Sequence, residues 1–302
     1  MHMFRTSGRR FALLLVAALL ATGCGSLHVV KTTGRAPAPS HDGNAGSGSG
    51  AAPAPTFTAT LEAQDSRLSA ALLAVAIAPR AATYRLLAQE YRRLGVLDKA
   101  HEHFSNAVAM DRTDAASYDA LARIWRDWGA ADRGLADAYR AVYYAPDSAA
   151  AANTLGTLLQ ATGHIDDARL WYARAIHLDK DAWYALNNLC YVAVLTQPEE
   201  ALNTCQAAVA AAPGSKARQA QNNLALAHAA AGDRSGAKQW FRRAGEPATA
   251  SYNYGIAMMA TRAYKEAAVA FEEALQADPL FTMAALRARQ ARLAASNEEH
   301  TP

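Results

Sequence analysis

Residues 81–114 read AATYRLLAQEYRRLGVLDKAHEHFSNAVAMDRTD, and this stretch decides the fold. Large apolar and small residues occupy fixed positions in it, namely Tyr84, Leu87, Ala88, Tyr91, Gly95, Ala100, Phe104 and Ala107 at positions 4, 7, 8, 11, 15, 20, 24 and 27. The next stretch repeats this spacing with Tyr118, Leu121, Ala122, Trp125, Gly129, Ala138 and Ala141. Self-similarity at a period of about 34 residues indicates a repeated pair of antiparallel helices.

Further copies of the pattern follow toward the carboxy terminus, with Leu155, Gly156, Gly163, Ala168 and Tyr172 in the third copy. Small residues at positions 8, 20 and 27 let the two backbones approach, and large residues fill the remaining space. One such unit cannot bury its apolar face alone, so successive units must stack on each other. The sequence therefore predicts an all-α solenoid.

These residues make the chain resemble the tetratricopeptide repeat family, over roughly residues 81–280. The resemblance implies a right-handed superhelix of antiparallel helix pairs, with six repeats over 81–281. Residues 61–80 match the second helix of a degenerate leading repeat. Residues 282–302 form a final helix and tail, whose Arg287, Arg289 and Arg292 suit an exposed capping face. The fourth repeat, 183–215, is one residue short at its helix–helix turn, Thr196-Gln197-Pro198.

The amino terminus has the pattern of an export signal. Three arginines precede an apolar stretch, 11–21, that is too short to span a bilayer, so residues 1–23 are expected to be a signal peptide. The run Leu20-Ala21-Thr22-Gly23-Cys24 resembles the lipobox of bacterial lipoproteins, which implies lipidation of Cys24. The alternative is ordinary secretion that leaves Cys24 as a free thiol. Gly25 in place of Asp implies, by the same resemblance, the outer membrane of a Gram-negative cell, with the chain facing the periplasm.

Residues 24–60 are rich in Gly, Ser, Ala and Pro, and we expect a flexible tether there. The formal net charge of +3 falls to zero once the three leader arginines are removed, so nucleic-acid binding is not expected. No trio of acid, base and nucleophile and no spacing typical of a zinc site is visible. We therefore expect no enzyme activity, no cofactor, no metal and no small-molecule substrate.

Cys190 and Cys205 occupy positions that lie opposite each other in an antiparallel helix pair. An export signal would place them in an oxidising compartment, which favours a disulfide between the two helices of the fourth repeat. The alternative is a pair of small buried thiols that fill the space between the helices.

In the tetratricopeptide family, the first helix of each pair lines a peptide-binding groove, chiefly through positions 2, 5, 6, 9, 12 and 13. The residues that match these positions include Arg85, Arg92, Arg123, Arg126, Asn188, Tyr191, Asn223 and Asn253. Arginines can grip carboxylates with two parallel hydrogen bonds, and an asparagine can donate to and accept from a peptide backbone. The alternative is that the asparagines follow the family consensus and that the arginines are merely solvated. The partner would be a protein or peptide.

The segments 187–191 and 221–227 resemble the tight-adherence group among the pilus-assembly and secretin-pilot lipoproteins. That resemblance implies a membrane-tethered scaffold that binds a secretin or another subunit of a pilus or secretion machine. Two alternatives stay open, a regulator of a peptidoglycan synthase or hydrolase and an accessory of outer-membrane barrel assembly.

Overall fold

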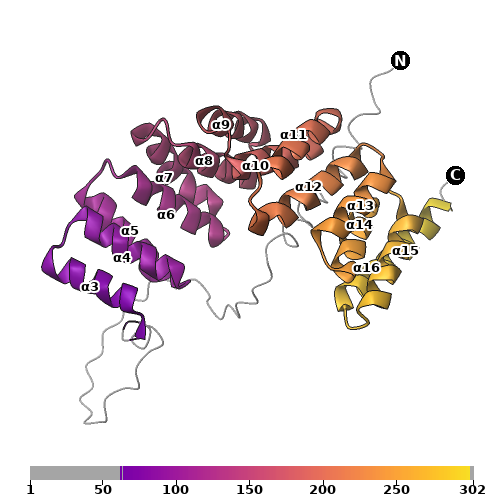
Figure 1. Ribbon diagram of the computed structural model, residues 1–302, viewed down its shortest axis with the longest axis horizontal. Helices are drawn as coiled ribbons and strands as arrows, with labels where there is room; N and C mark the ends of the chain where they lie inside the picture. The colour runs from indigo at the N-terminus through magenta and orange to yellow at the C-terminus, as the bar shows by residue number, and fades with distance from the viewer. Residues whose placement is uncertain (1–61, 63, 300–302) are drawn as a thin grey trace, which may run out of the picture. The chain divides into compact units, whose positions relative to one another are not determined.

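The computed structural model of the protein describes Glu62 and residues 64–299 (Figure 1). Over these residues the fold is all-α, with helices α3 to α16, one short 3-10 helix and no strand. The expected signal peptide, Cys24 and the whole of the expected tether lie outside the described residues. The described residues fall into two compact units, and the chain passes from one to the other between Ser117 and Tyr118.

The first unit contains α3 (Ser66–Ile77), α4 (Ala81–Arg93) and α5 (Leu97–Met110). Its core is built from the repeat positions. The exposed fraction is at most 1% for each of the core residues Leu68, Leu87, Ala88, Tyr91, Ala100 and Phe104. The helix α3 packs on α4, in the place of the expected degenerate leading repeat. The first unit is thus one complete helix pair preceded by a single helix.

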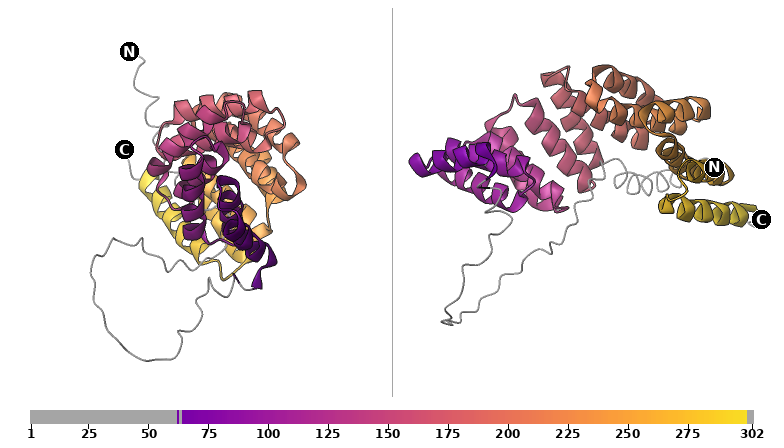
Figure 2. Two further views of the ribbon diagram at one scale, coloured as in Figure 1. Left: turned by 90° about the vertical axis from the view of Figure 1, so that its left-hand side faces the viewer. Right: turned by 60° about the horizontal axis from the view of Figure 1, so that its bottom comes forward.

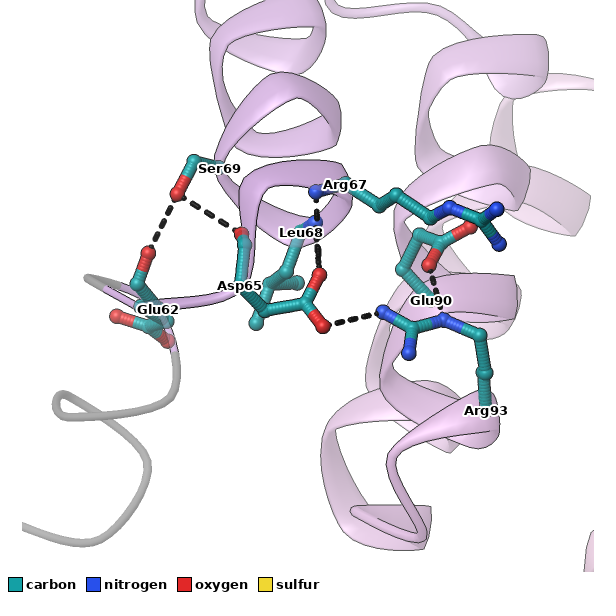
Figure 3. A network of polar contacts seen from close by, with 7 residues as sticks. All are labelled: Glu62, Asp65, Arg67, Leu68, Ser69, Glu90 and Arg93. Carbon is teal, nitrogen blue, oxygen red and sulfur yellow. Dashed lines mark hydrogen bonds and ion pairs between the residues drawn. The ribbon is translucent and has the colours of Figure 1, made fainter.

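Polar contacts hold α3 against α4 (Figure 3). The carboxylate of Asp65 caps α3 by accepting hydrogen bonds from the backbone N–H groups of Arg67 and Leu68, at 3.1 and 3.0 Å. Its other oxygen lies 2.7 Å from Nη2 of Arg93, which also donates through Nε to Glu90 at 2.6 Å. A second link joins the hydroxyl of Tyr91 to Oε1 of Glu62 at 2.5 Å.

The second unit continues the helix pairs and ends with a single helix. Its elements are α6 (Ala115–Asp127, from Tyr118), α7 (Ala131–Tyr144), α8 (Ala149–Ala161), α9 (Ile165–Leu178), α10 (Trp183–Thr196), α11 (Pro198–Ala211), η1 (Gly214–Lys216), α12 (Ala217–Ala230), α13 (Arg234–Ala244), α14 (Pro247–Ala260), α15 (Tyr264–Ala277) and α16 (Thr282–Glu299). From α8 onward each pair packs beside the next pair in the chain (Figure 2). This is the arrangement of a tetratricopeptide-repeat solenoid.

The turns between paired helices need a left-handed backbone at one position. Gly95, Gly129, Gly163 and Gly232 supply it with φ between 76° and 86°. Arg262 stands at the equivalent place between α14 and α15 and has φ 62°, a conformation that costs a residue with a Cβ about 1–2 kcal/mol. In the shortened fourth repeat the second helix, α11, begins directly at Pro198.

Each pair closes where position 8 of the first helix meets position 24 of the second. A Cβ added to Gly156 would lie 2.7 Å from Cε1 of Tyr172, and one added to Gly255 would lie 2.7 Å from Cε1 of Phe271. The aromatic rings therefore rest directly on the backbone of the first helix. In the fourth repeat a disulfide takes the place of this contact. None of the described helices is long and apolar enough to cross a membrane.

Candidate functional site

The first helices of successive pairs present one continuous side, which we call the first-helix face. It carries repeat positions 2, 5, 6, 9 and 12 of α8, α10, α12 and α14, together with positions 5, 6, 9 and 12 of α6, all in the second unit. Polar side chains connect these helices one to the next. Nη1 of Arg126 on α6 donates to Oγ1 of Thr157 on α8 at 3.4 Å, and asparagine pairs continue the series from α8 to α14.

The asparagine pairs follow a single rule. An asparagine at position 6 donates through Nδ2 to Oδ1 of an asparagine at position 5 of the preceding repeat. The pairs are Asn188 to Asn153 at 2.9 Å, Asn223 to Asn187 at 2.9 Å and Asn253 to Asn222 at 3.4 Å. Each asparagine predicted to hold a ligand thus makes a hydrogen bond to the neighbouring repeat.

Burial separates these asparagines into two classes. Asn223 and its acceptor Asn187 are 5% and 2% exposed, so this pair fixes the register between α10 and α12 and offers little to a ligand. Asn188 and Asn253 are half-buried and keep part of their surface in contact with solvent. Tyr191 is also half-buried and packs against the core of the carboxy-terminal repeats.

The predicted groove arginines are divided between the two units. Arg85 and Arg92 lie on α4 in the first unit, and Arg123 and Arg126 lie on α6 in the second. Nη1 of Arg85 lies 2.7 Å from the buried carboxylate of Asp114, which also accepts from the hydroxyl and the backbone N–H of Ser117.

The two arginines of the second unit have carboxylate partners as well. Arg123 lies 3.4 Å from Oδ2 of Asp119, and Nη2 of Arg126 lies 2.7 Å from Oδ1 of Asp127. Arg85, Arg123 and Arg126 therefore form ion pairs within their own units. The sequence interpretation expected them to hold a ligand instead.

Cys190 and Cys205 form a disulfide between α10 and α11, with their sulfurs 2.11 Å apart and their Cα atoms 4.7 Å apart. Both residues are fully buried. Cys190 lies two residues beyond Asn188 on α10, so the bond holds the helix that carries the central asparagines. It joins the two helices of the repeat whose turn is shortened.

The described residues contain no group of three side chains that could hold a metal ion. His103 stacks on Tyr84 and Tyr91, with ring centroids 6.0 and 5.4 Å apart. Burial against these rings lowers its pKa and favours the neutral imidazole. This histidine is a packing residue of the first unit.

Exposed apolar side chains extend the first-helix face onto α16. Met283, Leu286 and Leu293 are 44%, 49% and 56% exposed, and they occupy positions 2, 5 and 12 if α16 is counted as the first helix of a further repeat. The sequence interpretation missed them because it treated α16 only as a cap. The spacing of these residues was the available signal.

Comparisons with known proteins show what the chain resembles. No protein-family model matches it, and neither does any curated protein sequence. Among solved structures, the Cut9 and Hcn1 hetero-tetramer of APC/C matches with a TM-score of 0.62 and 18% identity, over 78% of this chain and 48% of that chain. The chain thus spans about half the length of that structure.

Two further matches cover most of the length of the other protein. PilW, described as a widely conserved type IV pilus biogenesis factor, matches with a TM-score of 0.57 and 19% identity, over 67% of this chain and 94% of that one. A tetratricopeptide repeat protein from Parabacteroides merdae matches with a TM-score of 0.55 and 13% identity, over 74% of this chain and 91% of that one. The chain therefore has the fold of the tetratricopeptide-repeat proteins.

Proposed function

We propose that this protein is a scaffold for protein–protein interaction, tethered to the outer membrane on its periplasmic side, that assists the assembly of a pilus or secretion machine. The observation that carries the proposal is the first-helix face. It runs over consecutive repeats and ends in large apolar side chains that are exposed to solvent. Monomeric proteins seldom expose such groups together unless they bind a partner.

Several features support the finer parts of the proposal. The leader and Cys24 match an exported lipoprotein, and a lipid on Cys24 would supply membrane anchorage. The fold similarity to PilW agrees with a role in pilus assembly, a role that is named for PilW itself.

Cross-linking in intact cells, followed by affinity purification and mass spectrometry, tests the proposal. Wild type would be compared with Leu293→Asp and with Val269→Asp as a matched control. Leu293 and Val269 are 56% and 55% exposed, but Val269 lies on the second helix α15. We expect a secretin or pilus subunit to be captured by wild type and by Val269→Asp and to be lost with Leu293→Asp.

A Cys24→Ser variant tests the membrane part separately, because it removes the proposed lipid and should move the protein from the membrane to the soluble fraction. Capture of peptidoglycan enzymes or of barrel-assembly proteins in place of pilus or secretion subunits would contradict the proposed role. It would favour one of the two alternatives that the sequence left open.

A further inference from the structure

The helix α16 carries a heptad stripe on its solvent side. Met283, Leu286, Gln290, Leu293 and Asn297 follow each other at spacings of three and four residues, and we call this stripe the α16 seam. This spacing places all five on one side of a helix, as at the a and d positions of a coiled coil. All five are exposed, and α16 is the longest described helix with 18 residues.

The opposite side of α16 is already packed. Ala284, Ala288 and Ala291 are at most 1% exposed and form the stripe by which α16 packs on α15. The seam is therefore a second apolar surface on the same helix, in addition to the surface that attaches α16 to the solenoid.

The seam is not a surface prepared for the second helix of a further repeat. In complete repeats, position 8 of the first helix meets its own second helix, as Gly156 meets Tyr172 and Gly255 meets Phe271. The equivalent residue on α16 is Arg289, whose long charged side chain would block such a contact. Near it, Arg292 forms an ion pair with Glu272 of α15.

Two arginines flank the seam at its centre. Arg287 and Arg289 stand beside Leu286 and Gln290, at the positions that correspond to e and g of a coiled coil. Nη1 of Arg287 donates to Oε1 of Gln290 at 2.8 Å. Among the residues that the structure describes, no carboxylate pairs with Arg287 or Arg289.

This charge pattern decides between two kinds of occupant. In an antiparallel pair of α16 helices from two copies of the chain, centred on Leu286 and Gln290, the flanking arginines would lie opposite each other, and like charges across such a pair are unfavourable. In a parallel pair they would face Thr282 and Ala294 and would gain no acidic partner. A helix with glutamate or aspartate beside its apolar stripe would instead pair with both arginines. The polar Gln290 in the middle of the seam would favour one register of that helix.

We propose that the α16 seam binds an amphipathic helix of a partner protein, in which acidic side chains flank the apolar stripe. The inference rests on the proposed function, because it names the class of partner that the scaffold takes. Docking would bury the seam leucines and neutralise Arg287 and Arg289 at once.

Two synthetic peptides of about three heptads each test this inference with the full chain. Both carry Leu at a and d with one central Asn, and they differ in having either Glu or Lys at e and g. Fluorescence anisotropy should show that the Glu peptide binds roughly tenfold or more tightly than the Lys peptide. Equal binding of the two peptides would overturn the inference.

Variants locate the binding. Leu286→Asp should weaken binding of the Glu peptide by about tenfold or more, whereas the control Val269→Asp should leave it unchanged. The double variant Arg287→Glu/Arg289→Glu should reverse the preference in favour of the Lys peptide, which a merely unfolded protein could not do. Sedimentation should find no dimer that depends on Leu286, and finding one would show that a second copy is the occupant.

The two proposals can fail separately. If a pilus or secretion subunit is captured in cells but the Glu peptide does not bind, the seam inference is wrong and the proposed function stands. If the Glu peptide binds at the seam but no such subunit is captured, the proposed function is wrong and the seam still binds an acidic helix.

Discussion

The repeats up to α14 and the final helix α16 differ in what their polar groups bind. In the repeats, Arg123 pairs with Asp119, and Asn188 and Asn223 donate to asparagines of the preceding repeat. On α16, Arg287 and Arg289 pair with no carboxylate in the described part of the chain, and they flank exposed apolar side chains. The comparison teaches that charged residues at groove positions are not all available to a ligand.

The largest expected effect concerns the disulfide that joins α10 to α11 in the fourth repeat. The variant Cys190→Ala/Cys205→Ala removes a cross-link between residues 15 apart, and the loop-entropy model gives a loss of about 3 kcal/mol in the free energy of unfolding. Urea denaturation of the variant and of wild type, with and without reductant, measures this loss. Reductant should destabilise wild type and leave the variant unchanged, and equal stability of the two oxidised proteins would contradict the prediction.

The next prediction tests whether the ion pair of a groove arginine, Arg85 with Asp114, stabilises the fold. Asp114→Ala removes the partner of Arg85 together with two hydrogen bonds from Ser117, and we expect a loss of about 2 kcal/mol. The exposed Asp98 at the start of α5 is the control, and Asp98→Ala should cost at most about 0.5 kcal/mol. Hydrogen exchange of α4 to α6 measures both changes. A similar loss for both substitutions would show that the ion pair of Arg85 with Asp114 adds no more to the free energy of unfolding than an exposed carboxylate does.

A smaller effect is expected at the turn before α15, where Arg262 adopts a left-handed backbone with φ 62°. Arg262→Gly should raise the free energy of unfolding by about 0.5–1 kcal/mol. Glycine removes the strain of the left-handed backbone, and the larger backbone entropy that it gives the unfolded chain cancels only part of that gain. Thermal denaturation against wild type measures the gain. The converse variant Gly163→Arg should lose stability, and a gain there would contradict the account of these turns.

The smallest expected effect is the pH dependence of the contact between α3 and α4. Hydrogen bonding to Arg93 and to the backbone N–H of Leu68 lowers the pKa of Asp65 below its ordinary value of 3.8. A lowered folded-state pKa means that the contact contributes stability above pH 3.8 and loses it as the pH falls further through the folded-state pKa. Hydrogen exchange of α3 between pH 5 and pH 2.5 should show this loss in wild type and not in Asp65→Asn.

The repeat pattern predicted most of the fold because each of its positions has a packing reason. The positions of Gly156 and Gly255 require a small residue, because an aromatic ring of the second helix lies on the backbone there. Small residues that recur at this repeat position can be recognised in the sequence. Cys190 and Cys205 lie opposite each other because the two helices of the pair are antiparallel. The left-handed backbone of Arg262 was not predicted, because arginine gives no local signal for that conformation.

The candidate site was less predictable than the fold. The pairing of Arg85 with Asp114 depends on the rotamers of side chains that are 29 residues apart, and a single sequence does not reveal such contacts. Asn223 was expected to face a ligand but is buried against α10, since helix register decides its environment. The heptad spacing on α16 was visible, but the neighbouring arginines led to its interpretation as a solvated cap.

Photo-cross-linking in intact cells tests directly whether the α16 seam contacts a pilus or secretion subunit. A photoreactive amino acid is placed at Gln290 in the α16 seam and, as a control, at the exposed Gln239 on the second helix α13. We expect a cross-link from position 290 alone, mapped by mass spectrometry to an amphipathic helix with acidic flanks in a pilus or secretion subunit. A cross-link to such a subunit from position 239 and none from position 290 would contradict it.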